Sequence, residues 1–160
     1  MNNSLQEKLI SQLHPYVPDD SVHILVAWIV KYGIQLSITR SRKTILGDYR
    51  WPQNGKGHRI TVNGDLNRYA FLITFVHEMA HLITWQLYRN KVLSHGKEWK
   101  QEFRKLMNEF AGRRIFPLAV KTAMKNHIVK PSFTHCMDKD LMQALSKYDE
   151  PVNSITVRAG

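Results

Sequence analysis

Hydrophobic and polar positions repeat with two different periods along the chain, and the change of period separates helices from strands. Residues 4–13 repeat hydrophobic side chains at helical spacing, and Pro15 and Pro18 end that segment. A second helical repeat begins at Val22 and stops before Gly33, a residue type that often ends helices in a left-handed conformation. Two helices are therefore expected at the start of the chain.

The next part of the chain is typical of strands with one buried face. We interpret three segments as strands, at 34–40, 44–51 and 58–63, and turn-forming Pro, Asn and Gly residues separate the last two. In the third segment Ile60 and Val62 fall on the same side, because side chains alternate along a strand. We expect a small three-stranded antiparallel sheet that buries this side.

Helical spacing returns in the second half of the chain. From 68 to 89 the hydrophobic residues lie on nearly every side, which indicates a central helix covered by other elements. Ser94 can cap a helix over 95–110, and shorter helices are expected at 117–125 and 138–148. Helices packed on one small sheet define the α+β class.

Length and composition fit a single domain. The chain has 160 residues, and its hydrophobic share of 43% is enough for a sizeable core. We expect one domain over residues 1–150 and a tail over 151–160, which carries no packing pattern.

The charge balance is the unusual part of the composition. Lys and Arg number 23 against 13 Asp and Glu, which leaves a net charge of +10. Such a surplus favours anionic partners such as nucleic acid, acidic protein surfaces or anionic lipid. Trp51, Trp85 and Trp99 could stack on unpaired bases, although burial in the core is the simpler expectation for each.

The location of the protein is predicted from what the sequence lacks. No hydrophobic run approaches the roughly 18 residues that a membrane span needs. The first residues also do not follow the pattern of a secretory signal. We therefore expect a cytoplasmic protein without membrane contact.

Three titratable residues interrupt the most hydrophobic predicted helix. His77, Glu78 and His81 form the motif H-E-x-x-H, which places both imidazoles on one face, one turn apart, within reach of one metal ion. Glu78 is set off around the helix, so it can bind a water molecule at the metal without being a ligand. Burying these groups unpaired would cost on the order of several kcal/mol. A metal ion would offset that cost, and a solvated cleft without metal is the alternative.

A catalytic zinc ion needs a third protein ligand and one open position. The downstream candidates are His95, Glu98, Glu102, His127 and His135. Thr84 and Leu87 stand where the metzincin pattern requires Gly and His, so that class is excluded. We favour His95 over Glu98, because the adjacent Gly96 allows two helices to approach closely.

Two motifs together resemble one protein family. The segments HEMAHLITW and SHGKEWKQEF are similar to the SprT-like (Spartan-type) zinc metalloproteases, in which a third His follows the H-E-x-x-H motif in an H-G-x-x-[FW] context. The strand pair before them also matches the family, with Arg42, Leu46, Gly47 and Tyr49 at the expected spacing. The resemblance covers residues 34–110 well and the ends more loosely.

The resemblance implies a zincin-like (gluzincin-type) metalloprotease core. His77, His81 and His95 would bind Zn²⁺, and Glu78 would act as the catalytic base in peptide-bond hydrolysis. Relatives of the Spartan type cleave proteins attached to DNA, so the resemblance implies protein substrates on DNA and an electrostatic DNA contact of low sequence specificity. Tyr49, His58 and Tyr88 are candidates for a second oxyanion donor.

Two other functions stay open at this point. One is a DNA-binding SprT-like module with little or no proteolytic activity, and the other is a general cytoplasmic zinc peptidase. Many bacterial relatives end in a Cys-based zinc ribbon, which this chain cannot form because Cys136 is its single cysteine. We expect either that the chain is truncated near Gly160, ahead of that module, or that it lacks the module.

Overall fold

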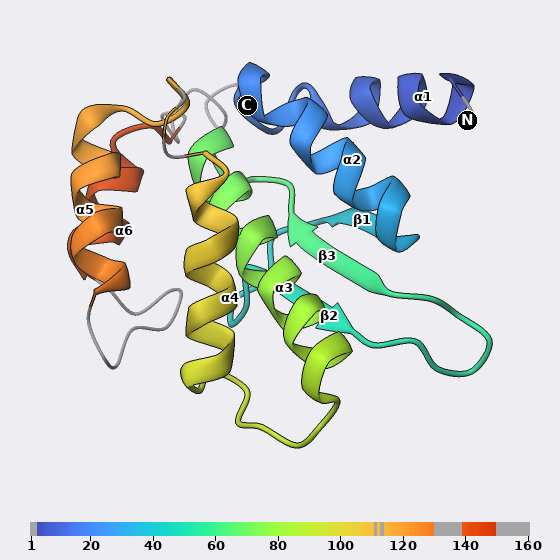
Figure 1. The fold of residues 1–160 in the computed structure, drawn as a ribbon. Coiled ribbons are helices and arrows are strands. Elements are labelled where there is room, and N and C mark those ends of the chain that lie inside the picture. The colour runs from blue at the N-terminus through green and yellow to red at the C-terminus, as the bar shows by residue number, and fades with distance from the viewer. Residues whose placement is uncertain (1–2, 111, 113, 130–138, 150–160) are drawn as a thin grey trace.

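A computed structural model of the chain describes residues 3–110, 112, 114–129 and 139–149. The described residues form six α-helices, one short 3-10 helix and a three-stranded sheet, so the α+β class is confirmed (Figure 1). The elements are α1 (Asn3–Leu13), η1 (Asp19–Ser21), α2 (Val22–Tyr32), β1 (Gln35–Thr39), β2 (Gly47–Arg50), β3 (Arg59–Asn63), α3 (Arg68–Tyr88), α4 (Lys97–Asn108), α5 (Leu118–Ile128) and α6 (Lys139–Ser146).

The sheet is mixed, and the prediction of an antiparallel sheet was wrong. Its order is β1-β3-β2, with β1 parallel and β2 antiparallel to the central strand β3. The connection over residues 40–46 carries the chain past β3 and places β2 on the far side of that strand. Ile60 and Val62 of β3 are fully buried, as predicted. The alternation of hydrophobic and polar residues identified the strands and their buried face, but it does not determine which strands pair.

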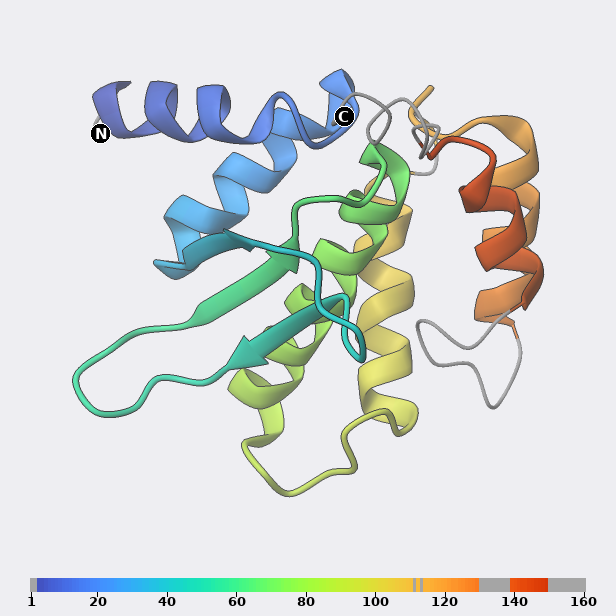
Figure 2. The same cartoon turned by 180° about the vertical axis from the view of Figure 1, so that it is seen from behind.

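Helix α3 is the centre of the fold. Figures 1 and 2 show it crossing one face of the sheet, with α4 beside it on the side away from α2. Asn67 caps its first turn, because the side-chain Oδ1 accepts from the backbone N–H groups of Tyr69 and Ala70 at 3.1 and 2.9 Å. Burial of every residue from Phe71 to Ala80 confirms the prediction of a covered central helix.

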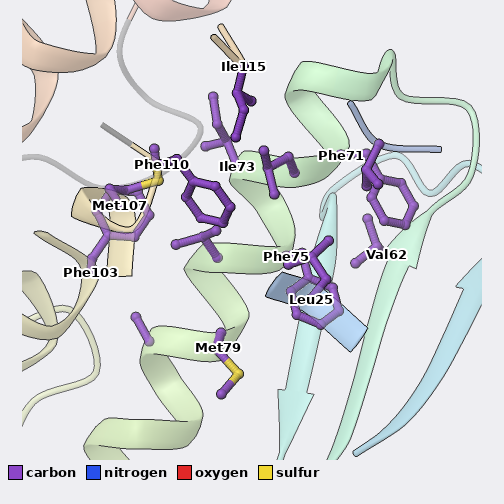
Figure 3. Packing of buried hydrophobic residues seen from close by; sticks show 14 of the residues in the cluster. Leu25, Val62, Phe71, Ile73, Phe75, Met79, Phe103, Met107, Phe110 and Ile115 are labelled. Atoms are coloured by element: carbon purple, nitrogen blue, oxygen red, sulfur yellow. The ribbon is translucent and has the colours of Figure 1, made fainter. Parts of the chain in front are cut away.

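Side chains from several elements meet around α3. Figure 3 shows Phe71 and Phe75 turned toward Leu25 of α2 and Val62 of β3, while Ile73 lies toward the end of α4. These residues are almost fully buried. Burying a large apolar side chain contributes about 1.5–3 kcal/mol, so this packing fixes α3 firmly relative to the sheet.

The remaining helices form two pairs at the ends of the fold. Helix α1 packs on α2, and α5 packs on α6 beyond α4 (Figure 2). Asn67 connects the second pair to the centre, because its Nδ2 donates to the carbonyl of Leu145 and to Asp149 at 2.9 and 2.6 Å. The same side chain therefore caps α3 and holds the C-terminal end of α6.

Several predicted boundaries differ from the structure. Helix α4 begins at Lys97 with Gly96 as its N-cap, so the prediction of a helix from 95 capped by Ser94 was wrong. Gly33 ends α2 with φ 62°, as predicted. The predicted tail, 151–160, lies outside the described residues. Within the described part of the chain, no helix combines the length and hydrophobicity that a membrane crossing requires.

Candidate metal centre

The site begins on the part of α3 that faces α4 and β2. His77 and Glu78 are each 6% exposed, and His81 is half-buried one turn further on. The rings of His77 and His81 lie 4.9 Å apart, as the four-residue spacing predicted. The packing of Phe71 and Phe75 in the core fixes the rotation of α3 and therefore the direction of these side chains.

The turn before α4 brings the third imidazole to the same point. Nε2 of His95 lies 3.1 Å from Nε2 of His77 and 3.1 Å from Nε2 of His81. Three nitrogens bound tetrahedrally at about 2.0–2.1 Å from one ion would lie about 3.3–3.4 Å apart. Among the described residues, this is the group of His, Cys, Asp and Glu side chains whose ligand atoms converge closely enough to hold a metal ion.

The protonation of these imidazoles suits metal binding. Burial, with a smaller contribution from His95, lowers the pKa of His81 to about 3. Burial and the charge of Lys100 also lower the pKa of His95. Neutral imidazoles each offer a lone pair, and lone pairs on nitrogens this close are best satisfied by a shared cation. The donor set therefore fits a divalent ion that prefers nitrogen ligands.

Trp99 of α4 forms the floor beneath the three histidines. Its ring lies 4.7 Å from that of His77 and 4.8 Å from that of His95, and it stacks on Phe103 at 5.2 Å. Its Nε1 donates to the carbonyl of His77 at 3.3 Å. Because Trp99 is fully buried, it cannot stack on a nucleobase, and one of the three candidates for such stacking is excluded.

Glu78 lies beside the three histidines in an unusual electrostatic environment. Burial and, to a smaller extent, the charge of Asp48 raise the pKa of its carboxyl to about 8, against the opposing charge of Arg42. Gly47 of β2 lies directly against it: a Cβ built at this glycine would lie 3.2 Å from Cγ of Glu78 and 2.8 Å from Cγ2 of Thr74. A larger residue at 47 could not stand this close to the helix.

The loop between β1 and β2 is held by a hydrogen-bonded arginine. Arg42 donates from Nε to Oδ1 of Asn63 at 2.7 Å and from Nη1 to Oγ1 of Thr61 at 3.0 Å. Asn63 in turn donates to the carbonyl of Ile45 at 2.9 Å. These bonds attach the loop to β3 and place its last residues next to Glu78.

The histidines and Glu78 open into a cleft of about 560 Å³. One wall consists of residues 44–49 and Trp51, the other of α3 from His77 to Trp85, and the turn over 89–95 closes one end. Among the described residues, strand β2 pairs only with β3 and is therefore an edge strand. A site of this kind combines a metal ligand set, a buried carboxylate and an open strand edge.

The comparison with known families agrees with this geometry. The sequence model of the SprT-like family matches residues 9–123, which is more than two thirds of the chain. The chain belongs to the SprT-like family. Membership suggests a metallopeptidase-like function for this SprT-like protein, and the three converging histidines are consistent with it. No curated protein and no solved structure matches the chain significantly.

Of the other candidate ligands, those that the structure describes do not join the cluster. Glu102 is buried and its carboxylate lies 3.5 Å from Nζ of Lys105, while Glu98 is half-buried in the first turn of α4. His127 is buried in α5, and His135 lies outside the described residues.

The candidates for a second oxyanion donor have different positions. Tyr49 lines the cleft, but its hydroxyl is hydrogen-bonded to Nδ1 of His58 at 2.8 Å. His58 and Tyr88 are not among the residues that line the cleft. Asp48 and Arg89 also line the cleft, and neither was predicted as a site residue. No sequence pattern marks them, because their places depend on the strand order and on the end of α3.

Proposed function

We propose that this protein is a zinc-dependent metalloendopeptidase with a zincin-like core. The observation that carries the proposal is the convergence of three imidazole nitrogens beside the buried carboxyl of Glu78. Nε2 of His95 lies 3.1 Å from Nε2 of His77 and 3.1 Å from Nε2 of His81. His77, His81 and His95 would hold Zn²⁺, which supplies Lewis acidity when bound. Three neutral ligands leave the positive charge of such an ion undiminished, which favours its Lewis acidity.

Glu78 carries the proton in the proposed reaction. Its carboxylate accepts a proton from the attacking water and returns it to the amine that leaves the scissile bond. Burial suits this role, because it raises the proton affinity of the carboxyl toward neutral pH. Gly47 permits the carboxylate to lie at the wall of the cleft, where an extended substrate would pass.

The free edge of β2 supports an extended protein substrate. A peptide that adds as a strand to this edge bonds through its backbone, so its sequence requirements would be loose. The net charge of +10 supports substrates that are themselves bound to DNA, because it favours contact with phosphates. Trp51, which is 40% exposed and lines the cleft, is available for contact with an unpaired base.

One set of measurements tests this proposal and separates it from its alternatives. Purified protein is analysed for metal content and incubated with a basic protein substrate, with and without single-stranded DNA. We expect the wild-type protein to contain about one zinc per chain and to cleave the substrate. The Glu78→Gln variant should retain the zinc but lose the cleavage. Near wild-type cleavage by that variant would refute the role of Glu78.

The dependence on DNA distinguishes the remaining possibilities. Cleavage that increases with DNA supports a protease for DNA-associated proteins, whereas cleavage indifferent to DNA supports a general peptidase. Salt-sensitive DNA binding without any cleavage supports a binding module. Electrostatic binding should weaken steeply between low and physiological salt.

A further inference from the structure

Arg89 closes α3 in a backbone conformation that arginine seldom adopts. Its φ of 55° and ψ of −132° fall in a region that favours glycine, because Cβ crowds the backbone there. Helices commonly end with glycine in such positions, as α2 does at Gly33. A non-glycine residue held in such a conformation is strained, and strain of this kind is concentrated at functional sites.

The side chain of Arg89 is fixed over the end of the helix. Its guanidinium lies 4.1 Å from the ring centre of Trp85, and its Nη1 donates to the carbonyls of Trp85 and Gln86 at 3.1 and 3.0 Å. Capping alone does not explain this arrangement, because the backbone N–H of Arg89 already donates to the carbonyl of Trp85 at 2.7 Å. Glycine would keep that bond without the strain.

The guanidinium retains an unused hydrogen-bonding edge. Within the described part of the chain, neither Nε nor Nη2 of Arg89 makes a hydrogen bond, and no carboxylate pairs with it. Nε and Nη2 together form the planar fork that binds a carboxylate through two parallel bonds. The arginine is therefore oriented by one nitrogen and free at the other two.

This free cation belongs to the cleft. Arg89 lines the cleft and is the only Lys or Arg among the described lining residues. Burial and, to a smaller extent, the charge of Arg89 lower the pKa of His58, and the same charge opposes the burial-induced rise in the pKa of Tyr49 on β2. Asp48, whose charge acts on Glu78, places negative charge in the same cleft. The cleft thus carries charges of both signs.

The position along α3 sets the distance from the metal centre. The guanidinium folds back over Trp85, between one and two turns beyond His81, which corresponds to roughly 6–12 Å along the helix axis. An extended peptide covers this distance in about two to four residues. A group bound by Arg89 would therefore lie a few residues from a bond held at the histidines.

We propose that Arg89 forms an acidic-residue subsite, in which its Nε–Nη2 edge binds the side-chain carboxylate of a substrate residue two to four positions from the scissile bond. The proposal rests on the proposed function only in taking the cleft as a substrate site. It makes Arg89 a specificity-determining residue rather than a catalytic one, because nothing places it at the histidines or Glu78.

A nucleobase is the other ligand that an Arg–Trp pair could accept. The geometry favours a carboxylate, because the guanidinium already covers Trp85 and leaves its in-plane edge, rather than an aromatic face, directed outward. Trp85 is also half-buried and contacts His58 edge-on at 5.8 Å, which restricts access to its other side.

The test measures peptide binding on the Glu78→Gln background, so that binding does not depend on hydrolysis. Zinc-loaded protein is titrated with fluorescent peptides that carry Asp, Asn or Lys at each position from four before to four after the central bond. At one position we expect Asp to bind about five- to tenfold more tightly than Asn, and Lys more weakly than either. Adding Arg89→Gly should remove this preference, and Arg89→Glu should reverse it in favour of Lys.

Arg89→Gly is suited to this test because it relieves strain and should fold normally. Lys91→Gly is the matched control, since Lys91 is exposed, lies two residues away and does not line the cleft. It should leave the preference for Asp unchanged. Both variants should keep the wild-type zinc content.

The outcomes separate this inference from the proposed function. Equal binding of the three peptides at every position, or a preference that survives Arg89→Gly, would overturn the acidic subsite even if the wild-type protein cleaves peptides. An Arg89-dependent preference in a protein that cleaves nothing would support the subsite and refute the proposed protease. If Arg89→Gly abolished binding of single-stranded DNA and left peptide binding unchanged, the ligand of Arg89 would be a nucleobase and the acidic subsite would be refuted.

Discussion

Gly47 of β2 and Glu78 of α3 lie in direct contact, and the missing side chain of the glycine is what allows it. A Cβ at position 47 would lie 3.2 Å from Cγ of Glu78, 2.8 Å from Cγ2 of Thr74 and 2.9 Å from the carbonyl oxygen of Thr61. The last of these neighbours is backbone and cannot move alone. The strand and the helix therefore keep their separation only with glycine at this position.

Replacing Gly47 by Ala should damage both stability and activity. Overpacking of this kind costs about 1–3 kcal/mol, and the shift it forces would displace Glu78. We expect a lower Tm and a larger fall in peptide cleavage than in zinc content. Gly57→Ala is the control, because its nearest neighbour, the carbonyl oxygen of Gly33, lies at an ordinary 3.5 Å. Equal stability and activity in the two variants would show that the contact is not restrictive.

The third ligand can be identified by comparing two residues at the start of α4. His95→Ala should weaken zinc binding by orders of magnitude, because it removes one of three converging nitrogens. Glu98→Ala should retain zinc, since its carboxylate is not part of the cluster. Competition with a chromogenic chelator measures both affinities. Zinc loss confined to the Glu98 variant would reassign the ligand.

Trp99 should support the metal centre without touching the substrate. Trp99→Phe keeps an aromatic ring on Phe103 but removes the Nε1 bond to the carbonyl of His77. We expect a loss of about 1 kcal/mol in unfolding free energy and a modest fall in zinc affinity. Denaturant unfolding and chelator competition measure the two effects. Trp51→Phe serves as the exposed control and should change neither quantity, while similar effects from both variants would contradict this role.

The protein stripped of metal should lose stability as the pH rises from about 6.5 to 8. Burial raises the pKa of Glu78 to about 8, so the folded chain holds this proton more tightly than the unfolded chain, and stability falls as the carboxyl ionises. The lowered pKa of His81, about 3, has the opposite sign, but its contribution is complete by about pH 6.5.

The expected loss of stability has an upper limit, and Glu78→Gln provides the control. Between pH 6.5 and 8, the ionisation of one carboxyl can lower the free energy of unfolding by about 2 kcal/mol at most. Chemical unfolding in the presence of a chelator measures it, and Glu78→Gln should show a flatter profile above pH 6.5. A stability that rises between pH 6.5 and 8 in the chelated wild type would show that Glu78 is not the group responsible.

Much of the metal centre followed from the sequence. The four-residue spacing of His77 and His81 determines that both imidazoles share one face of a helix, because the geometry of a helix is local. The surrounding hydrophobic residues determined that this helix would be central and covered, as the burial of α3 confirms. Helix and strand positions followed in the same way, since their periods are written in neighbouring residues.

Tertiary structure decided the rest, because it depends on contacts between residues far apart in the sequence. The parallel pairing of β1 with β3 is set by the path of the connection over 40–46, and alternating side chains carry no record of it. That pairing makes β2 the free edge and brings Gly47 against Glu78. The strained turn at Arg89, which places a single cation in the cleft, likewise exists only once α3 and its neighbours have packed.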